Sequence, residues 1–200
     1  AELTEAHADQ VLRGMELSMQ ATGADKAIFG IKAKRTRTVA ILKEATGGKD
    51  IKVQLLDDYY PAGDEFVLVH ECTGRLIPPG GIPLQVGTVV HNSETLYNIA
   101  EAAEGRPVTR KILTVAGEVA TPMSMAVPVG ITLREVIAIA GGPSIRDYSV
   151  FVGGLMMGKL TDDLNQPVTK TTGGLIVLPT SHRLVQRILT PTKAMHRIGK

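Results

Sequence analysis

Cysteine is almost absent from this sequence of 200 residues, and Cys72 is its one example. A single thiol excludes an internal disulfide framework, and it also excludes a cysteine-rich metal or iron–sulfur site within these residues. The shortage of cysteine therefore indicates a reducing compartment. His70 lies two residues before Cys72, but two candidate ligands with no others nearby do not predict a metal site.

Long apolar runs are also lacking. The best stretch, from Val127 to Ala140, is broken by Arg134 and Glu135, and it falls short of the roughly 20 apolar residues that span a bilayer. We therefore expect no direct membrane insertion. The chain has neither a starting Met nor a leader with a basic and then an apolar segment, so we expect it to be an excised or processed piece of a longer protein.

The chain has no marked excess of either charge, with 22 Lys and Arg against 20 Asp and Glu and a formal charge of +2. This balance argues against a nucleic-acid-binding surface. Basic residues cluster at Lys32 to Arg37 and after Arg183. We interpret both clusters as solvated helix faces in preference to phosphate sites.

The common catalytic signatures are missing as well. The sequence contains no Gly-x-Gly-x-x-Gly, no P-loop, no His-Glu-x-x-His and no Gly-x-Ser-x-Gly. These absences disfavour a metalloprotease, a stand-alone hydrolase and the usual nucleotide-binding loops.

Helix and strand patterns alternate in the first half of the chain. A helical apolar stripe covers Ala8 to Thr22 and stops at Gly23. A short apolar strand at Lys26 to Ile31, a helix through Thr38 to Ala45 and an alternating strand at Asp50 to Leu56 follow. Two strands joined by a helix are normally parallel, so we predict an α/β fold with a Rossmann-like parallel sheet.

Two further helices are expected before residue 107. Asp64 and Glu65 lead an apolar-periodic helix, and Ser93 to Ala103 form another with Ser93 as its N-cap. The stretch between them, Leu76 to Gly87, is too rich in proline and glycine for regular structure. Val86 to Val90 reads as a short strand-like run.

The pattern changes after Gly105. Thr109 to Thr121 reads as two strands with a turn at Gly117, followed by a helix at Leu133 to Ala140 and a strand at Tyr148 to Val152. This order suggests a small β-grasp unit of α+β type. Finally, we expect a strand at Gly174 to Leu178 to rejoin the first sheet, with a helix over Thr180 to Leu189.

Three segments could carry chemistry. In Tyr60 to Glu65 (YPAGDE), an aromatic ring, a turn without bulk and two acids meet at a helix start, which could hold a flat ligand, although such acids are also ordinary N-terminal helix charges. The polar segment His91 to Thr95 (HNSET) opens a helix whose N–H groups could receive a phosphate, although capping explains Ser93 equally well. The third segment, Gly153 to Gly158 (GGLMMG), could approach a partner, but we prefer to read its methionines as core gap-fillers.

The turn Tyr60 to Glu65, together with Ile77 to Pro83 (IPPGGIP) and Asn92 to Thr95 (NSET), carries a resemblance to a known family. The sequence resembles the C subunit of the Rnf electron-transport complex and the corrinoid reductase of propanediol-utilisation microcompartments. More distantly, it is similar to the NADH-oxidising 51-kDa subunit of respiratory complex I. The turn and the segment Val168 to Gly173 (VTKTTG) favour the corrinoid-reductase branch.

The resemblance implies a partial domain for FMN and NADH binding over residues 1–107 and a soluble-ligand-binding β-grasp domain over 108–158. Residues 159–200 would be a return strand and helix that lead toward an iron–sulfur region outside this chain. The family's glycine-rich FMN loop would likewise precede Ala1. The resemblance also implies seven cofactor-binding residues. Four of them would line the flavin and nicotinamide pocket, namely Tyr60, Gly63, Asp64 and Glu65. The other three, His91, Asn92 and Thr95, would contact the ribityl-phosphate of FMN. The resemblance implies no catalytic acid or base and no metal ligand among the seven.

The implied activity is that of an oxidoreductase. The intact protein would pass electrons from NADH through FMN to iron–sulfur clusters and on to a corrinoid or membrane acceptor, while this stretch alone would be inactive. Its partners would be other redox subunits or a corrinoid enzyme. Its location would be cytoplasmic, inside a bacterial microcompartment or at the periphery of a membrane complex.

Two alternatives stay open. The β-grasp half could be a binding module for a corrinoid or an adjacent redox subunit, without catalysis of its own. The chain could also be a scaffold within a microcompartment or a membrane complex. Titration with cobalamin and a pull-down from cell extract, respectively, would separate these possibilities from electron transfer.

Overall fold

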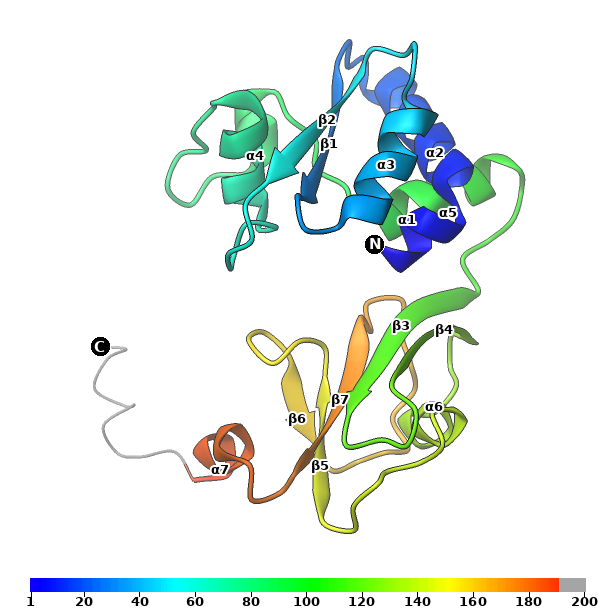
Figure 1. The fold of residues 1–200 in the computed structure, drawn as a ribbon, viewed down its shortest axis with the longest axis vertical. Coiled ribbons are helices and arrows are strands. Elements are labelled where there is room, and N and C mark those ends of the chain that lie inside the picture. The colour runs from blue at the N-terminus through cyan, green and yellow to red at the C-terminus, as the bar shows by residue number, and fades with distance from the viewer. Residues whose placement is uncertain (191–200) are drawn as a thin grey trace. The chain divides into compact units, whose positions relative to one another are not determined.

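A computed structural model of the chain describes residues 1–190 (Figure 1). The chain divides into two compact units, the first ending at Pro107 and the second beginning at Val108. Each unit has a hydrophobic core of its own. In the described residues, no helix is both long enough and apolar enough to span a membrane.

Unit 1 is an α/β layer structure around two parallel strands. Its elements, in chain order, are α1 (Glu2–Ala6), α2 (Ala8–Thr22), β1 (Ala27–Lys32), α3 (Thr36–Ala45), β2 (Ile51–Leu56), α4 (Glu65–Thr73), a 3-10 turn η1 (Pro83–Val86) and α5 (Ser93–Ala103). Strands β1 and β2 are in register from Ala27 opposite Ile51 to Lys32 opposite Leu56. The predicted α/β class and the parallel pairing are confirmed.

The two strands of unit 1 lie between two helical layers (Figure 1). On one face, Phe29 of β1 packs into a core with residues of α2, α3 and α5, including Val11, Leu42 and Leu96. On the other face, a Cβ built on Gly30 would overlap the side chain of Leu68 in α4. Because side chains alternate between the two faces of a strand, Phe29 lies in the core with α2, α3 and α5, whereas Gly30 faces α4. The missing side chain at Gly30 allows α4 to approach the strand closely.

Helix α2 has the limits that its sequence predicts. Gly23 adopts φ 70°, and its N–H bonds the Met19 carbonyl, which ends the helix in a left-handed cap. Within the helix, Gly14 is buried, and a Cβ there would overlap the backbone carbonyl of Leu96. This glycine therefore lets α2 and α5 cross in direct backbone contact.

Three local expectations for unit 1 are wrong. The run Val86 to Val90 forms no strand, because it leaves the 3-10 turn in an irregular path and pairs with neither β1 nor β2. Helix α5 starts at Ser93 as expected, but its N-cap is Asn92, one residue earlier. Helix α3 begins at Thr36, two residues before the predicted start.

Unit 2 is a five-stranded mixed sheet with one helix packed on it and a short helix at its end. Its elements are β3 (Arg110–Gly117), β4 (Met123–Pro128), α6 (Leu133–Ile139), β5 (Tyr148–Val152), β6 (Lys159–Thr161), β7 (Gly174–Pro179) and α7 (Arg183–Leu189). The strand order is β4-β3-β7-β5-β6, with β3 and β7 parallel and the other pairs antiparallel. Thr132 caps α6 in a capping box with Glu135.

The structure corrects three expectations for unit 2. Strand β7 does not rejoin the first sheet: Leu175 and Val177 are fully buried, and the strand forms the centre of the second sheet between β3 and β5. Methionines 156 and 157 are not core gap-fillers, because they lie at the tip between β5 and β6 with 73% and 86% of their surface exposed. The first hairpin turns after Gly117 rather than at it, and its second strand starts only at Met123.

Candidate functional site

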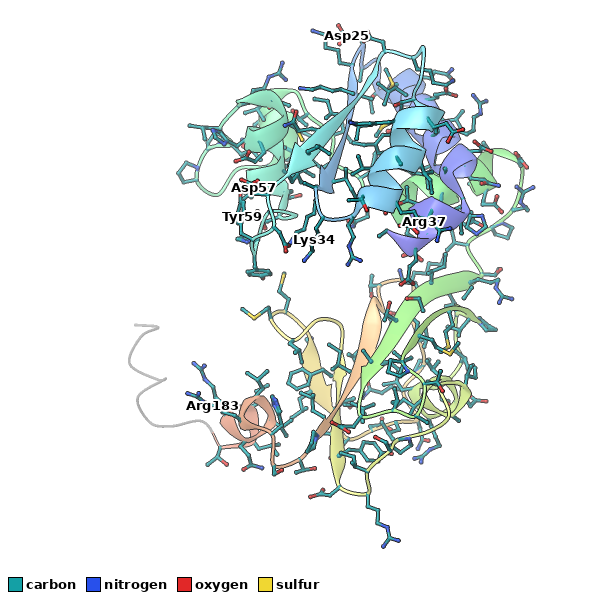
Figure 2. All side chains as sticks on the ribbon, viewed as in Figure 1. Asp25, Lys34, Arg37, Asp57, Tyr59 and Arg183 are labelled. Atoms are coloured by element: carbon teal, nitrogen blue, oxygen red, sulfur yellow. The ribbon has the colours of Figure 1, made fainter. Side chains whose placement is uncertain are left out.

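The carboxyl ends of β1 and β2 meet at one edge of unit 1. In Figure 2, Lys34, Asp57 and Tyr59 lie at this end, whereas Asp25, which precedes β1, lies at the opposite end. Parallel strands in α/β folds collect ligand-binding loops at their carboxyl edge. The Tyr60 to Glu65 turn leaves β2 at this edge and leads into α4.

The turn is a tight, hydrogen-bonded loop with an exposed aromatic ring. The Ala62 N–H donates to the Tyr59 carbonyl at 3.2 Å, and the Asp64 N–H donates to the Pro61 carbonyl at 2.6 Å. Ala62 is fully buried, while Tyr60 is 64% exposed and joined to Pro61 by a cis peptide. The buried alanine anchors the turn, and the ring of Tyr60 is available to a flat ligand.

Gly63 is a glycine that the fold of unit 1 does not itself require. Its φ lies outside the left-handed region, and a Cβ built on it would meet no atom within 4 Å. Neither backbone strain nor intrachain packing therefore explains the missing side chain. An open face at this position fits the close approach of a bound group.

The two acids of the turn have different roles. Asp64 is the N-cap of α4, and its Oδ1 accepts the Phe66 N–H at 3.0 Å. Asp64 therefore does serve as an ordinary N-terminal cap of a helix. Glu65, the first residue of α4, is exposed and makes no side-chain hydrogen bond or ion pair with the described residues. Of the two acids, Glu65 is the one free to contact a ligand.

The second candidate segment opens α5. His91 Nε2 lies 2.9 Å from Ser18 Oγ, which fixes this segment against α2. Asn92 is the N-cap of α5, but its side chain makes no capping bond, and both Asn92 and Thr95 are exposed. A helix start without a side-chain cap can accept an anion on its N–H groups.

The seven predicted site residues thus form two patches in unit 1. Within residues 1–190, no hydrogen bond or ion pair joins Tyr60, Gly63, Asp64 or Glu65 to His91, Asn92 or Thr95. The donor and acceptor types suit FMN, because a carboxylate, an amide and hydroxyls can bind its ribityl chain and a helix start can bind its phosphate. The bare Gly63 leaves room beside the turn. The residues present therefore fit this cofactor.

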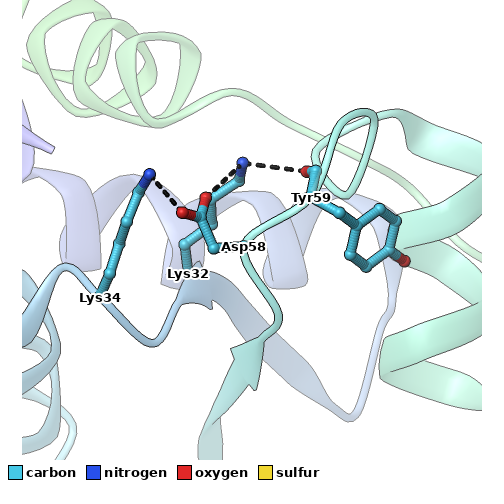
Figure 3. A network of polar contacts seen from close by, with 4 residues as sticks. All are labelled: Lys32, Lys34, Asp58 and Tyr59. Atoms are coloured by element: carbon cyan, nitrogen blue, oxygen red, sulfur yellow. Dashed lines mark hydrogen bonds and ion pairs between the residues drawn. The ribbon is translucent and has the colours of Figure 1, made fainter.

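One polar network at this edge was missed from the sequence. Lys32 and Lys34, which we interpreted as part of a solvated helix face, both bond the carboxylate of Asp58 (Figure 3). The bond from Lys34, and then that from Lys32, holds the pKa of Asp58 below its ordinary value. An acidic pair directly after a strand, Asp57 and Asp58, was the available signal.

Comparison with known families assigns both parts of the chain. Residues 1–101 match the family model of the Nuo51 FMN-binding domain, and residues 112–160 match the SLBB domain model. The first match covers half of the chain and includes every predicted site residue.

Three individual proteins illustrate the similarity. Cobalamin reductase PduS from Salmonella typhimurium is 46% identical over 96% of this chain and 43% of that protein. The C subunit of the Na(+)-translocating ferredoxin:NAD(+) oxidoreductase complex from Acetobacterium woodii is 32% identical over 97% of this chain and 44% of that protein. The crystal structure of an NAD+-reducing [NiFe]-hydrogenase in the air-oxidized state aligns with a TM-score of 0.73 and 25% identity over 90% of this chain and 37% of that one.

The chain spans less than half the length of the curated relatives it matches. The match over residues 1–101 falls within unit 1, which ends at Pro107. The chain belongs to the family of the Nuo51 FMN-binding domain, followed in this case by an SLBB domain.

Proposed function

We propose that unit 1 binds FMN and that the protein carrying this chain is an oxidoreductase that takes electrons from NADH. One observation carries the proposal beyond the family match. The fold gives no side-chain role to Gly63, Glu65 and Asn92 in the two patches: a Cβ on Gly63 would meet no atom within 4 Å, and the side chains of Glu65 and Asn92 make no hydrogen bond among the described residues. Residues that the fold leaves free at a ligand-binding edge are candidates for ligand contacts.

Six of the seven site residues have a definite task in this proposal, while Asp64 caps α4. Tyr60 packs beside the flavin ring, and the bare Gly63 allows the ring or the nicotinamide to approach the backbone. Glu65 accepts hydrogen bonds from hydroxyls of the ligand. At the other patch, Asn92 and Thr95 bind the ribityl-phosphate at the start of α5, and His91 is held for the same purpose by Ser18.

The cofactor supplies the conversion between two-electron hydride chemistry and one-electron transfer. The chain's own residues bind and orient it, and they shield it from water. None of them is required as a general acid or base. Because the sequence holds one cysteine, the iron–sulfur clusters that we propose for the intact protein need cysteines from outside these residues.

We propose a corrinoid as the final acceptor, with a membrane complex as the alternative. The chain is 46% identical to a cobalamin reductase and 32% identical to the ferredoxin:NAD(+) oxidoreductase subunit, over nearly the same share of its length. If a corrinoid is the acceptor, we expect the protein to lie in the cytoplasm, within a microcompartment. The alternative places the protein at the periphery of a membrane complex, beside other redox subunits.

The site is tested by Glu65→Ala and Asn92→Ala. We expect each change to weaken FMN binding roughly tenfold, because each removes hydrogen bonds to the ligand. The dissociation constant is measured by flavin fluorescence in the protein extended to the length of its relatives. Glu71→Ala is the matched control, since Glu71 is an exposed acid on the same helix α4. Unchanged flavin content in both site variants would contradict the site.

A second candidate function belongs to unit 2. A cleft of about 610 Å³ lies between the β5–β6 hairpin and residues 166–173, and it is lined by Gly154, Met157, Lys159, Thr171 and others. We propose that a ligand of unit 2 would bind in this cleft. Titration with aquacobalamin, followed by its absorption spectrum, tests whether the ligand is a corrinoid. The Met157→Ala variant should lower the affinity if the cleft is the site, and an unchanged affinity would exclude the cleft.

A further inference from the structure

Three charged side chains converge where β1 and β2 end. Lys32 is the last residue of β1, Lys34 follows two residues later, and Asp58 comes two residues after β2. Lys34 Nζ donates to Asp58 Oδ2 at 2.6 Å, and Lys32 Nζ donates to Asp58 Oδ1 at 3.2 Å (Figure 3). The two lysines therefore hold one carboxylate from both sides.

Lys32 also reaches the main chain of the turn. Its Nζ donates to the Tyr59 carbonyl at 3.0 Å. The same carbonyl accepts the Ala62 N–H at 3.2 Å, and the following bonds, from Asp64 N to Pro61 and from Phe66 N to Asp64, continue into α4. A continuous path of hydrogen bonds thus runs from the end of β1 through the turn to the first turn of α4.

Apolar packing gives this turn little support. Tyr59 is 42% exposed and Tyr60 is 64% exposed, while Ala62 is fully buried and has only a methyl group to pack. The position of the Tyr60 ring therefore depends on the polar network more than on the core. Exposed ion pairs contribute little to global stability, so their loss should move the turn without unfolding the unit.

We propose that Lys32 is a positioning residue of the flavin site, which it supports by fixing the Tyr60 to Glu65 turn through Asp58 and the Tyr59 carbonyl. This role rests on the proposed binding of FMN by unit 1. Lys34 assists by holding the second oxygen of Asp58, but it makes no bond to the main chain of the turn among the described contacts. Within the basic cluster at Lys32 to Arg37, Lys32 and Lys34 thus belong to the polar network of the turn, and the other basic residues do not.

The test measures the FMN dissociation constant of Lys32→Gln in the protein extended to the length of its relatives. We expect the affinity to fall roughly tenfold, since displacement of a positioning element by a fraction of an ångström is costly for binding. Lys34→Gln should have a smaller effect. Lys32→Arg should restore most of the affinity, and the double variant Lys32→Gln, Asp58→Asn should be weaker than Lys32→Gln by no more than the effect of Lys34→Gln, because the second change removes only the bond that Lys34 still makes.

Arg35→Gln is the matched control. It removes the same charge beside the network, but the Arg35 side chain makes no hydrogen bond or ion pair with the described residues. Its FMN affinity and its thermal midpoint should match those of the wild type. If Arg35→Gln weakens binding as much as Lys32→Gln, the lysine acts through general charge attraction and the positioning role is wrong.

Two further results would overturn the inference, and they are distinguishable. If the wild type binds FMN and Lys32→Gln binds it equally well, the positioning role fails while the proposed function stands. If the wild type itself does not bind FMN, both fail together. A loss of affinity in Lys32→Gln that comes with a lower thermal midpoint, and that Lys32→Arg does not rescue, would also contradict positioning.

Discussion

Gly63 and Gly14 show how differently two glycines can be used in one unit. A Cβ on Gly14 would overlap the Leu96 carbonyl, so this glycine is explained by the packing of α2 on α5. A Cβ on Gly63 would meet nothing within 4 Å. The packing of unit 1 therefore does not explain the absence of a side chain at Gly63, and we propose that a bound ligand uses this space.

Gly63→Ala should therefore separate binding from folding. We expect an unchanged thermal midpoint, because the methyl group meets no protein atom, and a flavin affinity roughly tenfold lower, because the methyl group meets the ligand. Thermal unfolding and a fluorescence titration of the same samples check this pair of results. A normal affinity would mean that the ligand does not approach Gly63.

Asp58 should limit the polar network of the turn at acidic pH. The two lysines lower its folded pKa below the value in the unfolded chain, so its contribution is fully present above the unfolded pKa and is lost as the pH falls through the folded value. We expect flavin affinity not to change between pH 5 and pH 8 through this carboxylate. In Lys34→Gln the fall in flavin affinity at acidic pH should occur at a higher pH than in the wild type, and titrations at a series of acidic pH values would detect it. If this fall occurs at the same pH, Lys34 does not affect the titration of Asp58.

The thiol of Cys72 should react slowly with alkylating reagents in the folded protein. Burial raises its pKa, so the folded chain holds less thiolate at a given pH than the unfolded chain does. Alkylation by iodoacetamide at pH 8 should therefore be several-fold slower in the native protein than in urea. Mass spectrometry of timed samples measures both rates, and equal rates would contradict a shielded thiol.

At the scale of elements, α2 and α5 approach each other in direct backbone contact at Gly14. Gly14→Ala should destabilise the unit by about 2 kcal/mol, since backbone atoms of Leu96 cannot rotate away from the new methyl group and the gain in helix propensity is smaller. Gln20→Ala, an exposed change on the same helix, should stay within about 0.5 kcal/mol of the wild type. Urea unfolding followed by circular dichroism compares them. Equal stability of the two variants would show that α5 can shift freely.

Local signals in the sequence were sufficient for most elements of unit 1. The apolar spacing and Gly23 predicted α2 with both of its limits, and Asp64 predicted the start of α4. Pairing between segments that lie far apart in the chain could not be predicted from the sequence. The place of β7 in the second sheet follows from its parallel pairing with β3, whose partners, such as Thr114 and Gly174, lie far apart in the chain, and its apolar run fits either sheet equally well.

The sequence named candidate residues for the site, which stay a prediction, but it did not reveal the contacts that these residues make. The resemblance named the turn and the α5 start, yet it could not tell that Asp64 is occupied as a cap while Glu65 is free. It also gave no hint of the Lys32 and Asp58 network, because two charged segments 26 residues apart meet only through the parallel pairing of β1 with β2.

At the scale of the whole molecule, the two units have separate hydrophobic cores, and we propose separate tasks for them. Val115 and Leu175 are fully buried in unit 2. Leu175→Ala should therefore cost unit 2 about 2–5 kcal/mol through the cavity it leaves. The flavin affinity of unit 1 should be unchanged. Calorimetry and a flavin titration of this variant check both statements, and a parallel loss of flavin would mean that unit 2 contributes to the site.

The most direct measurement is a fluorescence titration of FMN with the 200-residue chain and with a version extended to the length of its relatives. The proposed function predicts saturable binding with one FMN per chain by the extended protein. It also predicts weaker binding of riboflavin, which lacks the phosphate that the start of α5 would hold. Binding by the extended form alone would mean that residues outside this chain complete the site. No binding of FMN by either form would contradict the central claim and leave the binding role of unit 2 as the better account.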